Sequence, residues 1–279
     1  SRPTGANMDI RSKIAVVTGA AGGIGEATAC ELVRRGVKGL ALVDRSERVH
    51  ELKSTLKESG HREVAVETYV GDVTDPEFRR GVFDRTAAEM GVPRICVPAA
   101  GITRDSLAVR ISKETGEPAL YPIEDFRLVG EVTLPAPGYW ALETVARIAQ
   151  DRFRRGLKRW SPPEHIEGTI IFIGSISCRG NKGQISYAAT KAGLAGAAAT
   201  LTKEAMFYGV RCGVIHPGFT DTPMVRALGE DYIGKHVLPN TELQRLIRPA
   251  EIADAICFMI ANSAVSGQLW ADAGWAPTV

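Results

Sequence analysis

The sequence has no long hydrophobic run, no cysteine pairing pattern and almost no excess of charge. No apolar stretch reaches the roughly 18 residues that a membrane span needs, and no signal peptide is visible. The five cysteines are scattered without CxxC or metal-like spacing, so we expect neither a disulfide framework nor a metal site. A net charge of +2 favours neither nucleic acid nor a membrane as partner. These absences predict a cytoplasmic protein with reduced thiols.

The composition that remains is that of one large folded domain. Of the 279 residues, 44% are hydrophobic and 24% are charged, which suits a globular protein with a full core. Residues 1–7 precede Met8 and are interpreted as a cloning remnant outside the fold. Because no domain boundary or internal repeat is evident, we expect a single domain over residues 8–279.

Strand-like and helix-like segments alternate along the chain. The expected strands cover residues 13–18, 39–44, 64–69, 95–99, 169–174, 210–215 and 268–272. The expected helices cover residues 24–35, 46–59, 75–90, 125–150, 187–208 and 249–261. This alternation predicts an α/β fold, a doubly wound parallel sheet of seven strands with helices on both faces. Ligands of such sheets bind outside the carboxyl ends of the strands, where the sequence places Thr18, Asp44, Asp72, Gly101, Ser175 and Pro217.

A glycine-rich turn follows the first expected strand and opens a helix. Gly19 permits a tight turn, Gly23 lets backbone amides approach a pyrophosphate, and Gly25 permits close packing of helix and strand. The second strand ends in Asp44, where a carboxylate binds the ribose hydroxyls of NAD and repels the 2′-phosphate of NADP. Arg45 is the residue that could accommodate that phosphate, so NADP remains the second choice.

Tyr187 and Lys191 are spaced i and i+4, which puts them on one helix face. An ammonium near a phenol lowers its pKa from about 10 and makes the tyrosine a proton donor and acceptor near neutrality. Ser175, twelve residues before Tyr187, could hydrogen-bond the same substrate oxygen. The three residues predict a site that interconverts an alcohol and a carbonyl.

With these motifs, residues 8–279 resemble the single-domain branch of the short-chain dehydrogenase/reductases, which have a Rossmann-type fold. The glycine turn, Asp72 with Val73, the Ser175–Tyr187–Lys191 set and residues 217–222 carry the resemblance. Residues 101–107 and 187–193 are most similar to 3-oxoacyl-carrier-protein reductases and related hydroxysteroid dehydrogenases.

The resemblance implies a role for each matching residue. Tyr187 is the implied general acid or base, Lys191 lowers its pKa and binds the nicotinamide ribose, Ser175 steadies the substrate oxygen, and Thr222 orients the carboxamide. The implied cofactor contacts are Gly19, Gly23, Ile24, Gly25, Asp44, Arg45, Asp72, Val73, Ala100, Gly101, Tyr187, Lys191, Pro217, Gly218, Thr220 and Thr222.

The chain departs from the family pattern at three places. Pro98 and Ala99 stand where the family has two asparagines, before Ala100 and Gly101. Thr133 replaces the helical asparagine that holds a water in the family's proton relay, and is a further candidate for the catalytic set. Ser175 lies one residue nearer the tyrosine than usual, which indicates a deletion in the loop between them.

Two insertions and one variable segment are also notable. Residues 112–123 lengthen a loop on the active-site edge and form either a lid over the substrate entrance or a tolerated surface loop. Residues 151–165 are rich in arginine and are interpreted as a solvated cap on the opposite edge rather than a docking patch. Residues 223–247 are the expected substrate loop, in which Met224, Leu228, Tyr232 and Ile233 could line an apolar pocket. His216 is interpreted as a structural strand-end residue.

The leading interpretation is an NAD-dependent oxidoreductase that interconverts a secondary alcohol and a ketone, such as a 3-hydroxyacyl and 3-oxoacyl pair. Its partners are then a small alcohol, ketone or acyl thioester and further copies of the chain in a homodimer or homotetramer, since residues 192–199 form a small-residue helix face. A dinucleotide-binding regulator that has lost turnover is the alternative, because the family's asparagines are missing.

Overall fold

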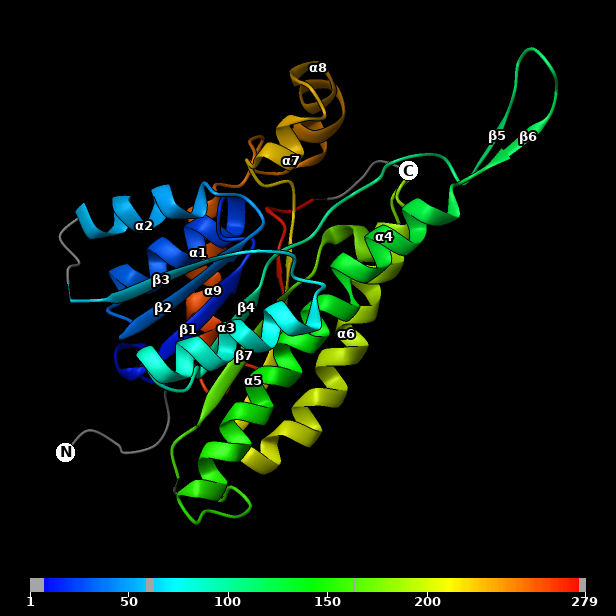
Figure 1. The fold of residues 1–279 in the computed structure, drawn as a ribbon. Helices are drawn as coiled ribbons and strands as arrows, with labels where there is room; N and C mark the ends of the chain where they lie inside the picture. Colours follow the sequence, from blue (N-terminus) through cyan, green and yellow to red (C-terminus); the bar gives the residue numbers. More distant parts are fainter. Residues whose placement is uncertain (1–7, 59–62, 163, 276–279) are drawn as a thin grey trace.

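A parallel sheet occupies the centre of the protein in the computed structural model, which describes residues 8–58, 63–162 and 164–275 (Figure 1). The strand order is β3-β2-β1-β4-β7-β8-β9 and every pairing is parallel. The seven strands are β1 (Ile14–Thr18), β2 (Gly39–Asp44), β3 (Ala65–Val70), β4 (Ile95–Pro98), β7 (Gly168–Ile173), β8 (Val210–Pro217) and β9 (Gly267–Ala271). Each predicted strand is therefore confirmed, whereas the interpreted remnant 1–7 lies outside the described residues.

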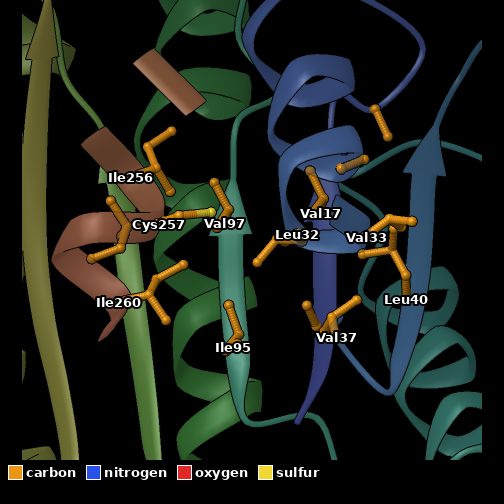
Figure 2. Close-up of a cluster of buried hydrophobic side chains, with 14 of the residues drawn as sticks. Val17, Leu32, Val33, Val37, Leu40, Ile95, Val97, Ile256, Cys257 and Ile260 are labelled. Carbon is orange, nitrogen blue, oxygen red and sulfur yellow. The ribbon is translucent and has the colours of Figure 1, made fainter. Parts of the chain in front are cut away.

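Helices cover both faces of this sheet (Figure 1). One face carries α1 (Gly23–Arg34), α2 (Val49–Glu58) and α9 (Pro249–Ala261), and the other carries α3 (Pro76–Glu89), α5 (Pro135–Arg154) and α6 (Ile185–Ala205). Successive strand residues face opposite sides, so Val17 packs with the first set and Val16 with the second. Figure 2 shows Leu32 of α1 and Ile256 of α9 pointing toward the central strands. The doubly wound fold is confirmed.

The helix predicted over residues 125–150 is two helices. The first, α4 (Ile123–Thr133), ends before Leu134, and α5 begins at Pro135. Proline has no N–H to continue the helical ladder, and its ring disfavours helical geometry at the residue before it. The prediction of one continuous helix was wrong, and the break leaves Thr133 buried at the end of α4.

The arginine-rich segment 151–165 is a solvated cap only in part. Arg154, Lys158 and Arg159 are exposed, but Arg152 is 1% exposed. Its guanidinium donates to carboxylate oxygens of Glu164 (2.7 Å) and Glu167 (2.9 Å) and to the Lys158 carbonyl (2.9 Å). The interpretation was therefore wrong for Arg152, which fastens the end of α5 to the segment leading into β7.

Removing Arg152 is expected to destabilise the fold. In Arg152→Ala two carboxylates lose their buried cation, so we expect the free energy of unfolding to fall by about 3 kcal/mol. Arg154→Ala, two residues along the same helix and exposed, is the matched control and should change it by less than about 0.5 kcal/mol. Urea titrations of both variants measure this, and equal midpoints would contradict the burial argument.

Residues 109–120 form a second, two-stranded sheet that projects from the body (Figure 1). Its strands are β5 (Val109–Ile111) and β6 (Pro118–Leu120). At the base, the Tyr121 hydroxyl donates to the Arg104 carbonyl (2.6 Å) and lies 2.9 Å from Ser186 Oγ, next to Tyr187. A loop is predicted here from the sequence because three-residue strands leave no periodic pattern to detect.

Candidate active site

The glycine turn between β1 and α1 forms the floor of a cavity of about 460 Å³. A Cβ on Gly25 would lie 2.1 Å from the Gly19 carbonyl oxygen, and one on Gly19 would lie 2.8 Å from Ala100 N. Gly19 also has φ +67, a conformation that favours glycine. Both positions therefore exclude a side chain. The Cβ on Gly25 would also lie 3.2 Å from the Thr18 carbonyl oxygen at the end of β1, in agreement with the expected close packing of helix and strand.

The start of α1 supplies anion-binding groups to this cavity. The first helical amide bond runs from Glu26 N to the Gly22 carbonyl (3.3 Å), so the amides of Gly23, Ile24 and Gly25 precede the helical ladder. A Cβ on Gly22 would meet no atom within 4 Å, which leaves that side of the turn open. Free amides and the positive end of the helix dipole suit a pyrophosphate.

Acidic side chains line the part of the cavity expected to hold adenosine. The Asp44 carboxylate, at the end of β2, accepts from Ala21 N (3.0 Å) and Ser46 N (2.9 Å). Asp72 accepts from Thr74 N (2.8 Å), which orders the turn in which Val73 also lines the cavity. Arg45 and Arg48 line the same region. These residues fit a dinucleotide whose adenosine ribose lies against the Asp44 carboxylate.

The loop after β4 forms another wall of the large cavity, and it lacks the two asparagines that the family has there. Thr18 at the end of β1 holds this loop instead: its carbonyl accepts from Ala99 N (3.2 Å) and its hydroxyl from Ala100 N (3.2 Å). These two hydrogen bonds to Thr18 hold the backbone of the loop in place without amide side chains. A Cβ on Gly101 would lie 3.8 Å from both Lys191 Nζ and Thr133 Cγ2, so Gly101 lies between these two side chains.

Thr133 is fully buried and lines neither of the two cavities described here. Its hydroxyl contacts the backbone of Ile102, with Oγ1 3.4 Å from Ile102 N and 3.5 Å from Ile102 O. It therefore supports the loop beside Lys191. A part for Thr133 in proton transfer stays a prediction.

Ser175, Tyr187 and Lys191 meet where the carboxyl ends of β7 and β8 face the start of α6. Ser175 is the first residue after β7 that leaves the sheet, and its Oγ accepts from Ser177 N (3.1 Å). Tyr187 lies in the first turn of α6 and Lys191 one turn later, with Nζ 5.4 Å from the centre of the phenol ring. Tyr187 lines both the large cavity and a second one of about 140 Å³.

The electrostatics of this set differ from the sequence prediction. Burial raises the pKa of Tyr187 to about 12, a hydrogen bond with Ser175 opposes the rise, and the charge of Asp105 adds to it. The Lys191 ammonium donates to the Ile173 carbonyl (2.6 Å), and burial lowers the pKa of Lys191 to about 8. The predicted lowering of the tyrosine pKa was therefore wrong for the protein without a ligand, because desolvation outweighs the hydrogen bond with Ser175.

The predicted carboxamide segment adjoins the second cavity. Pro217, Gly218, Thr220 and Thr222 line it with Ser175 and Tyr187. A Cβ on Gly218 would lie 2.8 Å from the Asp272 carbonyl oxygen, so the residue that follows β9 packs directly against this turn. Thr222 also lines the large cavity, which makes it, with Tyr187, a residue shared by both.

Two of the four apolar candidates in the expected substrate loop line a cavity. Met224 and Leu228 line the second cavity. Ile233 is 3% exposed and Tyr232 46% exposed, and both lie outside the residues lining either cavity. The loop folds into short helices, α7 (Pro223–Arg226), α8 (Glu230–Tyr232), η4 (Ile233–Val237) and η5 (Leu238–Asn240). None of the described lining residues belongs to 112–123, so the hairpin contributes nothing to the walls of these two cavities, and a lid role for it stays a prediction.

The second cavity has a polar wall that was not predicted from the sequence. Asn181 Nδ2 donates to Gln184 Oε1 (2.9 Å), and Gln184 Nε2 donates to Asp105 Oδ2 (2.8 Å). These three side chains line the cavity beside Tyr187. Asp105 lies within the run 101–107 that carried the family resemblance, which is the one signal that could have identified it.

The described residues also lack two further features. None of their helices is both long and apolar enough to cross a membrane. Among the same residues, no group of three or more His, Cys, Asp and Glu side chains could hold a metal ion.

Comparisons with known proteins agree with this geometry. The family described as short chain dehydrogenase matches residues 13–120, and the one described as Enoyl-(Acyl carrier protein) reductase matches residues 140–276. A 3-oxoacyl-[acyl-carrier-protein] reductase of Escherichia coli is 33% identical over 92% of this chain and 93% of its own. An acetoacetyl-CoA reductase of an Acinetobacter species is 32% identical over 90% and 91%.

Among solved structures, one titled ribose-5-phosphate isomerase from Brucella melitensis 16M has a TM-score of 0.76 at 27% identity. It covers 95% of this chain and 93% of its own. Because a fold hosts many chemistries, its title adds no reaction to the residues of this site. The identity and coverage of the reductases, with the matched motifs, show that the chain belongs to the short-chain dehydrogenase/reductase family of oxidoreductases.

Proposed function

We propose that the protein is an NAD-dependent oxidoreductase that interconverts a 3-hydroxyacyl and a 3-oxoacyl thioester, or a similar apolar secondary alcohol and ketone. The observation that carries the proposal is the position of Tyr187, shared by the large cavity that the glycine turn and Asp44 line and a smaller one that reaches Ser175. The printed names of the two reductases supply the acyl thioester as substrate class. Apolar Ile176, Phe219 and Leu228 line the smaller cavity and suit an acyl chain.

A nicotinamide dinucleotide would supply the hydride acceptor or donor. The amides at the start of α1 would hold its pyrophosphate, Asp44 its adenosine ribose, and Lys191 its second ribose. In reduction, Tyr187 gives its proton to the substrate oxygen, and Ser175 donates a hydrogen bond to the same oxygen. A tyrosine whose pKa is raised to about 12 keeps its proton at neutral pH but gives it up poorly, so Lys191 and the bound cofactor would have to lower this pKa for efficient proton transfer.

In oxidation, Tyr187 must accept the proton instead, so its phenolate has to be stabilised. A positive charge nearby favours phenolate, and Lys191 provides one 5.4 Å from the ring. The same charge would be reinforced by an oxidised nicotinamide, which is cationic.

The protein is proposed to act in the cytoplasm as a homodimer or homotetramer.

The choice of NAD over NADP rests on Asp44. Asp44→Asn removes the charge and keeps one acceptor oxygen, which can serve Ala21 N in the glycine turn while the bond from Ser46 N is lost. We expect kcat/KM for NAD to fall about tenfold and that for NADP to rise, because a charged hydrogen bond to the ribose is lost and repulsion of the 2′-phosphate is relieved. Steady-state kinetics with both cofactors measure this, with exposed Glu47→Gln as control. An unchanged NAD-to-NADP ratio would refute the role of Asp44.

The substitutions Pro98, Ala99 and Thr133 favour a second candidate, a dinucleotide-binding regulator without turnover. Two assays separate the candidates: reduction of an acetoacetyl thioester with NADH or NADPH, and oxidation of a panel of secondary alcohols with NAD⁺ or NADP⁺, each after titration of the cofactor into the protein. Hydride transfer to or from any of them supports the oxidoreductase. Cofactor binding without transfer to the whole panel supports the regulator.

A further inference from the structure

His216 is a buried histidine that the reaction described above does not use. It lies in β8, one residue before Pro217, and is 0% exposed. Its Nδ1 is 3.3 Å from Ser175 N and 3.2 Å from Ser175 O, so the imidazole contacts the backbone of the catalytic serine on both sides of its Cα. On the far side of the ring, Nε2 is 2.8 Å from Gln268 Oε1.

The plane of the imidazole is held by a stack of three side chains. Trp270 is paired with His216 in the register of β8 and β9, and their rings lie 4.3 Å apart at 15°. The Arg179 guanidinium lies 3.7 Å from the centre of the Trp270 ring. Arg179 ends the short helix η2 (Ile176–Arg179) that follows Ser175. Both ends of the segment from Ser175 to Arg179 are therefore tied to the same stack.

A glycine makes this approach possible. A Cβ on Gly174 would lie 2.4 Å from His216 Nδ1, so any other residue would push the ring away from Ser175. Gly174 N also donates to the Ile215 carbonyl (2.7 Å), which continues the pairing of β7 and β8 up to the serine. This contact gives a physical role to the glycine that occupies the family's usual serine spacing.

We propose that His216 is a positioning residue that fixes the backbone of Ser175 so that its hydroxyl faces the Tyr187 phenol; this role rests on the proposed function. His216 is absent from the described residues lining either cavity, so it acts through Ser175 and does not touch substrate. Burial lowers the pKa of His216, which keeps the imidazole neutral and leaves one nitrogen free to accept from Ser175 N–H.

Two isosteric variants test this role, because they keep different nitrogens. The amide of His216→Asn replaces Nδ1 and keeps a partner for Ser175, whereas that of His216→Gln replaces Nε2 and keeps only Gln268. We expect H216Q to lower kcat about tenfold with KM for cofactor and substrate unchanged, and H216N to keep kcat within about threefold of wild type. Exposed His50→Asn is the control. The reverse order of the two variants would overturn the proposal.

A double-mutant cycle shows whether the effect passes through the serine. In a Ser175→Ala background the H216Q substitution is expected to have no further effect on kcat, since no hydroxyl remains to be positioned. A tenfold loss that persists there would overturn the proposal. If H216Q does not fold, Gly174→Ala displaces the ring from the other side and should show the same kcat loss and the same dependence on Ser175. A wild-type protein that transfers no hydride refutes the proposed function itself, whereas an active wild type with an unaltered H216Q refutes only this inference.

Discussion

Substituting Tyr187 with phenylalanine is expected to lower kcat by about 10²- to 10⁴-fold, the range that a positioned general acid or base contributes. The ring remains, so the walls of both cavities and the packing of α6 should be preserved. The loss should therefore appear in kcat for reduction and for oxidation, with the dissociation constant of the cofactor little changed. Stopped-flow measurement of nicotinamide absorbance in both directions, with fluorescence titration of the cofactor, gives the two quantities separately.

Tyr139→Phe on α5 is the matched control, since its side chain is 55% exposed and loses the same hydroxyl. It should keep wild-type kcat. A Tyr187→Phe variant that keeps full activity would refute the acid–base role, whatever substrate is finally identified.

The parts of this protein that could be predicted from sequence are those built by local contacts. Val16 and Val17 are buried on opposite faces of the sheet, so a short apolar run identifies β1 without knowledge of its neighbours. Gly25 is required by a contact inside the turn itself, and Gly19 by its own positive φ of +67. Their spacing therefore carried the information, and the cofactor cavity follows from it together with Asp44 at the next strand end.

The parts that could not be predicted depend on segments distant in the chain. The spacing of Tyr187 and Lys191 placed a cation near a phenol, but the ammonium turns to the Ile173 carbonyl, 18 residues away. Asp105 reaches the second cavity through Gln184, 79 residues further on. Such contacts decide which charges are desolvated and paired. For this reason the sequence predicted that Ser175, Tyr187 and Lys191 lie close together but did not predict their pKa values.

The direction of the Lys191 shift has a consequence for stability. Lys191 is 5% exposed, its ammonium has one hydrogen bond to a carbonyl, and desolvation alone accounts for its pKa of about 8. Below about pH 8 the folded protein must bury a charged ammonium. There, the drop in the pKa of Lys191 from 10.5 to about 8 corresponds to roughly 3 kcal/mol of destabilisation of the folded protein. The ligand-free protein thus tolerates an unfavourable charge at the position where, by the proposed function, the cofactor and the phenol need one.

Lys191→Met should therefore abolish most activity and stabilise the fold. Losing the bond to Ile173 costs about 1 kcal/mol, so we expect a net gain of about 2 kcal/mol and a rise in Tm of roughly 5 °C at pH 7. Activity should fall about 10²-fold or more. Exposed Lys203→Met, on the same helix, is the control for both measurements.

The pH dependence distinguishes this cause from a generic gain in hydrophobic packing. The unfolded chain titrates Lys191 near 10.5 and the folded chain near 8, so between these values the unfolded state binds more protons and wild-type stability rises with pH. The Tm gap between Lys191→Met and wild type is thus expected to be widest below pH 8 and to close toward pH 10.5. Calorimetry from pH 7 to 10 measures it. A gap that stays constant across this range would show that the stabilisation comes from packing, and that the buried ammonium costs the fold nothing.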